Sequence, residues 1–296
     1  MTIRWGVSPI AWANDDMPEL GGDTPLDSIL ADIRDVGFEG VELGGKFPRD
    51  AATLKPLLDS YGLDLIGGWY SGSLLVQDAD AEIDALQDHL HLLKAMGSSV
   101  FVFAETSNAV HGDRAVPLTG APRLAARDWK TFGARMTDVA DYVKSEGLKF
   151  AYHHHLGTVV ETAADVNAFI TATGPSVGLT LDTGHAALGG VNSLAIIGDH
   201  PGRVAHVHCK DVRWETFTKQ KSRGSSFLDG VLAGMFTVPG DGGIDYAEIM
   251  QALKRMDYSG WIVIEAEQDP SVAEPRTYAD LGLKTLKARA AEAELV

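Results

Sequence analysis

The strongest constraint on the fold is a regular alternation of short apolar runs with longer segments of helical periodicity. Apolar runs bounded by turn residues predict buried strands, and apolar residues three and four apart predict amphipathic helices. The predicted strands are residues 3–10, 38–43, 63–69, 99–105, 149–155, 177–182, 204–210 and 261–267. The clearest predicted helices are residues 25–36, 81–96, 129–145 and 246–256.

Glycines mark the expected ends of several helices, directly before the next strand. They are Gly37, Gly62, Gly97, Gly147 and Gly174. A glycine in the left-handed conformation is a common way to end a helix and turn the chain back toward a sheet. These positions therefore predict short helix-to-strand turns.

Strict alternation of strands and helices implies parallel strands joined by right-handed crossovers. Eight such units over about 250 residues are typical of a closed barrel. The alternative is an open, doubly wound sheet, but no early strand is followed by a glycine-rich phosphate loop, and the pair Gly44-Gly45 lacks the required spacing. We predict an α/β protein with a (β/α)8 TIM barrel and one domain over residues 1–296.

The longest segment without a clear strand or helix pattern is residues 213–243, after the seventh predicted strand. It contains Phe217, Phe227, Phe236 and several glycines. Excursions of this length are usually functional or disordered, and the aromatic residues favour an ordered lid or a subunit contact. Because such barrels are often oligomers, a homo-oligomer is a further expectation.

Charge and cysteine content exclude several classes of partner. The formal net charge is −16, which repels phosphate backbones and anionic headgroups, so we expect no binding to nucleic acid or to membranes. A single cysteine, Cys209, cannot form an intramolecular disulfide and suits a reducing compartment. The first residues lead directly into a strand without a signal-peptide pattern, and no apolar run is long enough to span a bilayer. We therefore expect a cytoplasmic protein.

The predicted chemistry lies at the carboxyl ends of the last four strands, where TIM barrels carry their catalytic residues. These ends contain His153, His154, His155, Asp182, His185, His206, His208, Lys210, Glu265 and Glu267. Side chains two apart share a face of a strand, which groups His153 with His155, and Glu265 with Glu267. Nitrogen and carboxylate ligands from adjacent strands predict a metal site that suits Mn²⁺, Co²⁺, Fe²⁺ or Zn²⁺ better than Ca²⁺.

Isolated histidines receive no role, because a lone histidine is more often structural than a ligand. They are His89, His91, His111 and His200. His206 lies deepest and can simply fill the barrel, and His154 is expected to face the helices. Glu42 ends the second strand, where a packing role and a substrate contact are equally supported. Trp12 and Trp69 could form an apolar wall for a ring, or belong to the core.

Further segments carry a resemblance to a known family. Residues 14–21 (NDDMPELG), 152–158 (YHHHLGT), 234–242 (GMFTVPGDG) and 265–270 (EAEQDP) are the most specific. Together with the motifs at residues 182–185 and 206–208, they make the chain resemble the inosose dehydratases. These form a branch of the xylose isomerase-like barrel superfamily, and the resemblance covers nearly the whole chain.

This resemblance implies dehydration of 2-keto-myo-inositol (scyllo-inosose) to a trihydroxycyclohexane-1,2-dione in myo-inositol catabolism. It implies a small cyclic polyol ketone as substrate, Mn²⁺ or Co²⁺ as the metal, and glutathione as a possible further cofactor. The metal ligands that it carries over are Asp182, His208 and Glu265. Relatives have a glutamate at the end of the fifth strand, where this sequence has His153. Either His153 or water therefore completes the shell, and Glu161 is a poorer substitute.

Loss of water beside a ketone, through an enediolate, needs a base for the α-proton and an acid for the departing hydroxyl. His155 and Lys210 are the candidates, and the sequence leaves open which is the base. His185 and Glu267 would orient ring hydroxyls.

Three other functions compete with this one. A sugar epimerase or isomerase of the same superfamily would use the same metal and the same enediolate. A metal-dependent nuclease is disfavoured by the acidic charge, and a non-catalytic sugar-binding barrel by the clustered histidines.

Overall fold

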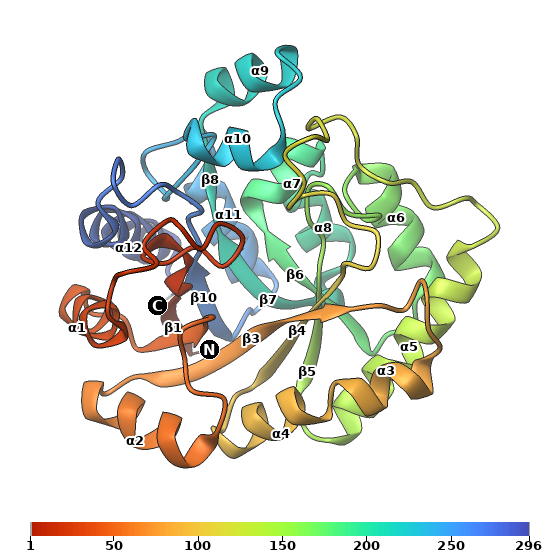
Figure 1. Ribbon diagram of the computed structural model, residues 1–296, viewed down its shortest axis with the longest axis horizontal. Helices are drawn as coiled ribbons and strands as arrows, with labels where there is room; N and C mark the ends of the chain where they lie inside the picture. Colours follow the sequence, from red (N-terminus) through yellow and green to blue (C-terminus); the bar gives the residue numbers. More distant parts are fainter. Residues whose placement is uncertain (1, 296) are drawn as a thin grey trace.

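The computed structural model describes residues 2–295 of the chain. Parallel strands close into a barrel in the order β1-β10-β7-β6-β5-β4-β3-β2 (Figure 1). Their bounds are β1 Ile3–Val7, β2 Gly40–Leu43, β3 Asp64–Gly72, β4 Val100–Glu105, β5 Lys149–His153, β6 Val177–Asp182, β7 Val204–Cys209 and β10 Gly260–Ile264. The predicted (β/α)8 barrel is therefore confirmed. β1 is shorter than predicted because the chain turns at Pro9, which has no N–H to donate to a ladder.

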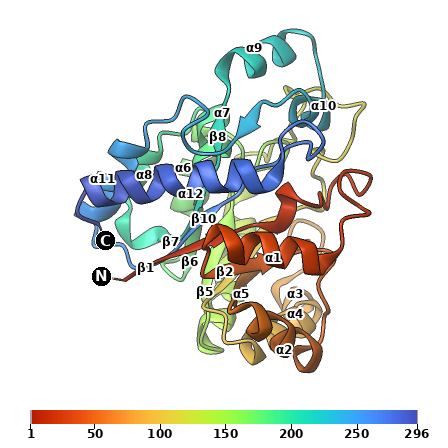
Figure 2. The ribbon, with the colours of Figure 1, turned by 90° about the vertical axis from the view of Figure 1, so that its left-hand side faces the viewer.

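Helices surround the barrel on its outer side (Figures 1 and 2). Their bounds are α1 Leu26–Val36, α2 Ala51–Tyr61, α3 Ala79–Ala85, α4 Gln87–Ala95, α5 Trp129–Ser145, α6 Ala163–Ala172, α7 Thr183–Gly189, α8 Ser193–Asp199, α11 Tyr246–Arg255 and α12 Pro275–Glu292. There are also two 3-10 turns: η1 Pro9–Ala11 follows β1, and η2 Pro201–Arg203 precedes β7. The predicted helix 81–96 is divided at Leu86, which is buried between α3 and α4. Among residues 2–295, none of the helices has the length and apolar character needed to cross a membrane.

Each strand has an outer face toward the helices and an inner face toward the barrel axis. On β6, Leu179 and Leu181 belong to the main apolar core with the helices. Thr180 and Asp182 alternate with them and are also buried, so they point into the barrel. A small inner apolar layer, including Val102, fills the barrel below its polar end. The strand period therefore selects which strand-end side chains can meet inside the barrel.

Four of the five predicted glycine turns have the expected backbone. Gly37, Gly62, Gly97 and Gly147 have positive φ values between 68° and 97°, which favour glycine. Gly174 differs, because α6 ends at Thr173 in an extended conformation and Gly174 is absent from the positive-φ residues. A side chain at Gly174 would instead approach Thr137 Cγ2 to 2.6 Å. Close packing, rather than helix capping, explains that glycine.

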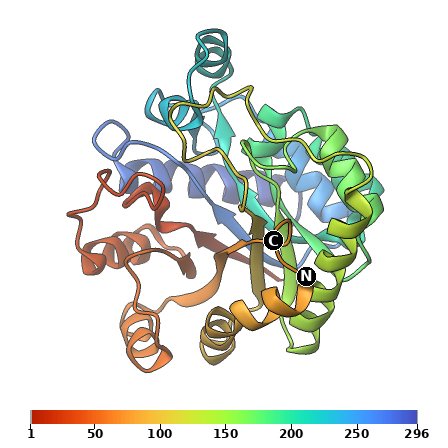
Figure 3. The same cartoon turned by 45° about the vertical axis from the view of Figure 1, so that its right-hand side comes forward.

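Residues 213–243 are not the irregular excursion that the sequence predicts. They contain α9 Trp214–Ser222 and α10 Phe227–Leu232, and a ribbon pairs β8 Asp211–Val212 with β9 Phe236–Thr237. Phe227 and Phe236 belong to a separate apolar cluster on this side of the barrel. Helix α9 has no buried residue and stands clear of the barrel at the top of Figure 3. Its missing apolar face explains why sequence periodicity did not reveal it.

His89 on α4 makes stability depend on pH. Its ring lies 5.8 Å from that of Tyr70 and 5.1 Å from that of Phe101, and Nε2 donates to the Gly68 carbonyl at 3.2 Å. Burial lowers the pKa of His89 to about 4, against the opposing effect of that hydrogen bond. The unfolded histidine has a pKa of about 6.5, so the unfolded chain binds the proton first. The contribution of neutral His89 to the free energy of unfolding is therefore present above about pH 6.5 and is lost as the pH falls toward 4.

We expect His89→Gln to reduce the loss of unfolding free energy between pH 7 and pH 4 by about 2–3 kcal/mol. Urea unfolding at several pH values measures this difference. His91→Gln is the matched control, because His91 is exposed on the same helix. Equal acid sensitivity in the wild type and the His89 variant would contradict the prediction.

Candidate active site

A cavity of about 270 Å³ opens at the carboxyl ends of the strands. Its apolar lining includes Ile10, Leu43, Trp69 and Val102. Its polar lining includes Ser8, Asp15, Asp16, Glu42, Arg49, Ser71, Thr106, His111, His155, His208, Glu265 and Glu267. A cavity lined by both polar and apolar side chains suits a small ring with hydroxyl groups at its edge.

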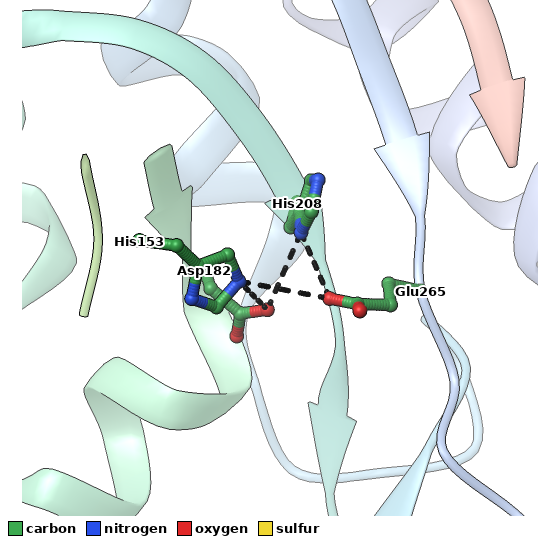
Figure 4. A group of neighbouring side chains, drawn as sticks. All are labelled: His153, Asp182, His208 and Glu265. Atoms are coloured by element: carbon green, nitrogen blue, oxygen red, sulfur yellow. Dashed lines mark hydrogen bonds and ion pairs between the residues drawn. The ribbon is translucent and has the colours of Figure 1, made fainter. Parts of the chain in front are cut away.

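Four side chains from four neighbouring strand ends converge beside this cavity (Figure 4). They are His153 at the end of β5, Asp182 at the end of β6, His208 on β7 and Glu265 directly after β10. One ligand atom from each lies within 4.8 Å of the others. His153 Nε2 is 3.6 Å from Asp182 Oδ2 and 3.8 Å from Glu265 Oε2. Parallel pairing produces this arrangement, since Asp182 is in register with His208.

Unpaired polar atoms show that this group fits a divalent ion. Within the described residues, both ring nitrogens of His153 and Asp182 Oδ2 are buried without a hydrogen-bond partner. Asp182 Oδ1 accepts from the His185 N–H at 2.8 Å as the N-cap of α7, which holds the carboxylate and leaves Oδ2 free. Buried polar atoms without partners are costly unless they bind something. Glu161 is outside the group and instead accepts from the Gly157 N–H at 2.7 Å.

His208 and Glu265 each favour the charged form of the other. Burial lowers the pKa of His208, but Glu42 and Glu265 outweigh it and raise that pKa well above its ordinary value. Burial raises the pKa of Glu265, but Lys210 and His208 reverse this and lower it strongly. Glu265 therefore stays ionised and keeps a cation favourable here.

Lys210 lies in a second part of the site, next to the four-residue group. Its side chain is fully buried, and Nζ donates to Glu267 Oε1 and lies 2.9 Å from His185 Nε2. Nζ is also 3.4 Å from Glu265 Oε2 and 3.7 Å from Asp182 Oδ2. Burial alone would lower the pKa of Lys210, but the three carboxylates raise it. The surroundings of Lys210 therefore favour the ammonium form.

His155 lines the cavity and lies near the same Glu267 oxygen that Lys210 contacts. Its Nδ1 donates to the Leu156 carbonyl at 2.7 Å, which leaves Nε2 as the unprotonated nitrogen of a neutral ring. Nε2 lies 4.0 Å from Glu267 Oε1. Burial, followed by His111 and His153, lowers the pKa of His155 well below its ordinary value. A neutral imidazole with a free nitrogen at the cavity is suited to accept a proton.

His185 and Glu267 lie beside Lys210 and His155, at the strand ends where the sequence predicts them. The His155 and His185 rings lie 3.7 Å apart between centroids. Burial raises the pKa of Glu267 to about 7, against the lowering effect of Lys210. Glu267 lines the cavity, whereas His185 lies behind it. Their predicted contacts with ring hydroxyls remain a proposal.

Glu42 and His206 form a third buried group. Glu42 Oε1 lies 2.9 Å from His206 Nε2 and 3.0 Å from His208 Nε2. Burial raises the pKa of Glu42, but His208 and His206 outweigh it and lower the pKa to about 2. His206 therefore does more than fill the barrel.

The two predicted tryptophans have different positions. Trp69 lines the cavity with 36% of its surface exposed, and its indole lies 5.2 Å from the His153 ring. Trp12 is buried in the apolar core, its indole N–H donates to Asp32 at 3.0 Å, and it is absent from the cavity lining. Tertiary packing thus assigns Trp12 to the core, because a hydrogen-bond acceptor for its N–H lies on α1 rather than in the cavity.

Sequence reasoning missed several cavity residues. His111 received no role, yet it lines the cavity with its ring 4.9 Å from that of His155. Asp15 and Asp16 come from the loop after β1, and Arg49 comes from the loop before α2. The two aspartates lie inside one of the segments that carry the family resemblance, which was the signal available for them. The other two come from loops without any pattern.

Comparisons with known proteins agree with this architecture. Residues 30–289 match the family model described as xylose isomerase-like TIM barrel. The chain is 46% identical over 293 residues to the rhizopine catabolism protein MocC of Rhizobium meliloti, covering 99% of this chain and 90% of that protein. It is 39% identical over 291 residues to an inosose dehydratase of Lacticaseibacillus casei, covering 97% of each.

A solved structure of L-ribulose 3-epimerase has a TM-score of 0.67 to this chain at 19% identity, covering 100% of this chain and 98% of that one. At that identity the likeness concerns the fold. The family match and the two sequence relatives together span nearly all of the chain. The chain therefore belongs to the xylose isomerase-like TIM barrel family.

Proposed function

We propose that the protein is a metal-dependent dehydratase that converts 2-keto-myo-inositol (scyllo-inosose) to a trihydroxycyclohexane-1,2-dione through an enediolate. The metal, Mn²⁺ or Co²⁺, would be held by His153, Asp182, His208 and Glu265. Curated relatives named inosose dehydratase, which share 36–39% identity with the chain, support this reaction class.

The observation that carries the proposal is the placement of two different proton-handling groups beside one metal-ligand group. A divalent ion there would act as a Lewis acid toward the substrate's keto oxygen, worth several kcal/mol. Lys210 is held as an ammonium ion by three carboxylates, and His155 presents a free nitrogen. Dehydration needs one proton donor and one acceptor, and the site contains both.

We assign the base and the acid, which the sequence left open, from the hydrogen bonds of His155 and Lys210. His155 Nε2 would remove the α-proton, because its Nδ1 is committed to the Leu156 carbonyl. Lys210 would donate a proton to the departing hydroxyl, since its surroundings favour the ammonium form. Glu267 contacts Lys210 and lies 4.0 Å from His155, so its carboxylate can pass a proton from His155 to Lys210 after the reaction. The proposal needs no glutathione, because side chains in the site supply both groups.

The cavity walls suit a cyclic polyol. Trp69 offers a partly exposed aromatic surface against which the C–H face of a six-membered ring can pack. Asp16 and Thr106 from loops, and Ser71 from β3, line the same cavity with a carboxylate and two hydroxyls that can bond to ring hydroxyls. The ring would then lie between an apolar wall and polar groups at its edge.

The reaction itself is tested with chelator-treated protein and 2-keto-myo-inositol, with and without added Mn²⁺ or Co²⁺. We expect metal-dependent formation of a product that has lost the mass of one water and absorbs in the ultraviolet as an unsaturated dione. A product of unchanged mass would indicate an epimerase or isomerase instead. Unchanged substrate with both metals would contradict the proposed substrate.

A further inference from the structure

We propose that Glu42 is a positioning residue for the metal centre, fixing the ring of His208 so that Nδ1 faces the ion. This role differs from the substrate contact that the sequence allowed, and it rests on the metal centre of the proposed function. Glu42 and His208 are 166 residues apart in the chain, and barrel closure brings them together.

The two ring nitrogens of His208 face different groups. Nδ1 lies 2.8 Å from Glu265 Oε2 and 3.8 Å from Asp182 Oδ2, which places it in the four-residue group. Nε2 lies 3.0 Å from Glu42 Oε1. Ionised carboxylates only accept, so without an ion both ring nitrogens of His208 donate, Nδ1 to Glu265 and Nε2 to Glu42. An ion in the four-residue group would replace the proton on Nδ1, whereas the proton on Nε2 would stay in its bond to Glu42. Metal-ligating histidines commonly bond to a carboxylate in this way, which sets the tautomer and strengthens the ligand.

Glu42 is itself held from a second direction. His206 Nε2 lies 2.9 Å from the same oxygen, Oε1, so two imidazoles of one strand share one carboxylate oxygen. His206 and His208 are two residues apart on β7 and therefore share its inner face. All three side chains are buried. The carboxylate thus has little freedom to turn away from His208.

This third group could instead hold a second ion, because Glu42, His206 and His208 also lie within 4.8 Å of one another. Hydrogen bonding argues against that reading. Both distances to Oε1 are normal for N–H···O bonds, and none of the three residues has a buried unpaired polar atom among the described residues. By contrast, His153 and Asp182 do have such atoms. Of these two groups, therefore, only the four-residue group has buried polar atoms without a partner.

The test compares Mn²⁺ binding by the wild type and Glu42→Gln without any substrate, by titration that follows the free ion. We expect one ion per chain in both, with about 10–100-fold weaker affinity in the variant. The Co²⁺ absorption spectrum should also change, because the His208 ring is less firmly oriented. Glu105→Gln is the matched control: Glu105 is buried at the end of β4 and bonds Ser107, outside the metal group. It should bind Mn²⁺ like the wild type.

Unchanged Mn²⁺ affinity and an unchanged Co²⁺ spectrum in folded Glu42→Gln would overturn the inference. Two ions in the wild type and one in the variant would make Glu42 a direct ligand instead. Asp in place of Glu42 retains the charge but shortens the reach, so it should also weaken binding. Because substrate is absent, these outcomes do not depend on the dehydratase assay. Wild-type protein that binds no ion would instead remove the metal centre itself.

Discussion

Replacing Lys210 by methionine is expected to lower turnover by roughly 10²–10⁴-fold, the range for general acid–base groups. Methionine has a similar length but carries no proton to donate to the departing hydroxyl. The four metal-ligand side chains do not include Lys210, so the variant should still bind the ion. Steady-state kinetics with saturating metal, together with metal analysis of the purified protein, measures both quantities.

Folding must be checked in this variant, because it leaves Glu267 and its neighbours without a buried cation. Circular dichroism and thermal unfolding show whether the barrel persists. Lys144→Met is the control, since Lys144 is exposed on α5, and its turnover should match that of the wild type. Turnover near the wild-type value in a folded, metal-loaded Lys210 variant would remove Lys210 from the mechanism.

A second large effect is expected from Asp182→Asn. Asparagine can still accept the His185 N–H and cap α7, but it removes the negative charge that the metal group requires. Turnover should fall by roughly 10³-fold or more, since loss of the Lewis acid costs several kcal/mol in the transition state. The stabilisation that added Mn²⁺ gives to the wild type, about 2.7 kcal/mol at 100 times Kd, should disappear.

Asp50→Asn provides a matched control for this substitution. Asp50 also caps a helix, accepting the Thr53 N–H at 2.8 Å at the start of α2, and lies outside the metal-ligand groups. It should retain both turnover and the rise in melting temperature with Mn²⁺. If Asp182→Asn binds Mn²⁺ as tightly as this control does, Asp182 is not a ligand.

The family relationship and the proposed reaction narrow what the cavity can accept. Its volume of about 270 Å³ and its single aromatic wall at Trp69 suit one small ring rather than a polymer. The buried Lys210 ammonium also contacts His185 and Glu267. These two residues, with His155, form a group that could otherwise hold another ion. A lysine thus supplies the second positive charge of the site.

Local sequence properties determined the barrel and the chemical nature of its site. Apolar runs and helical periods report burial on one face of each element, and that information is local to a few residues. The strand-end residues His153, Asp182, His208 and Glu265 were identifiable because the two-residue period of a strand and the polarity of parallel barrels place them at one rim.

Only the tertiary structure decided which atoms meet. Barrel closure brings Glu42 of β2 against His206 of β7, 164 residues later, and turns one oxygen to two imidazoles. Trp12 follows β1 and Trp69 lies near the end of β3, yet Trp12 enters the core and Trp69 lines the cavity. Helix α9 lacks the apolar face that would reveal it in the sequence. Hydrogen-bond partners and protonation states depend on distances between residues far apart in the chain, and no local period contains that information.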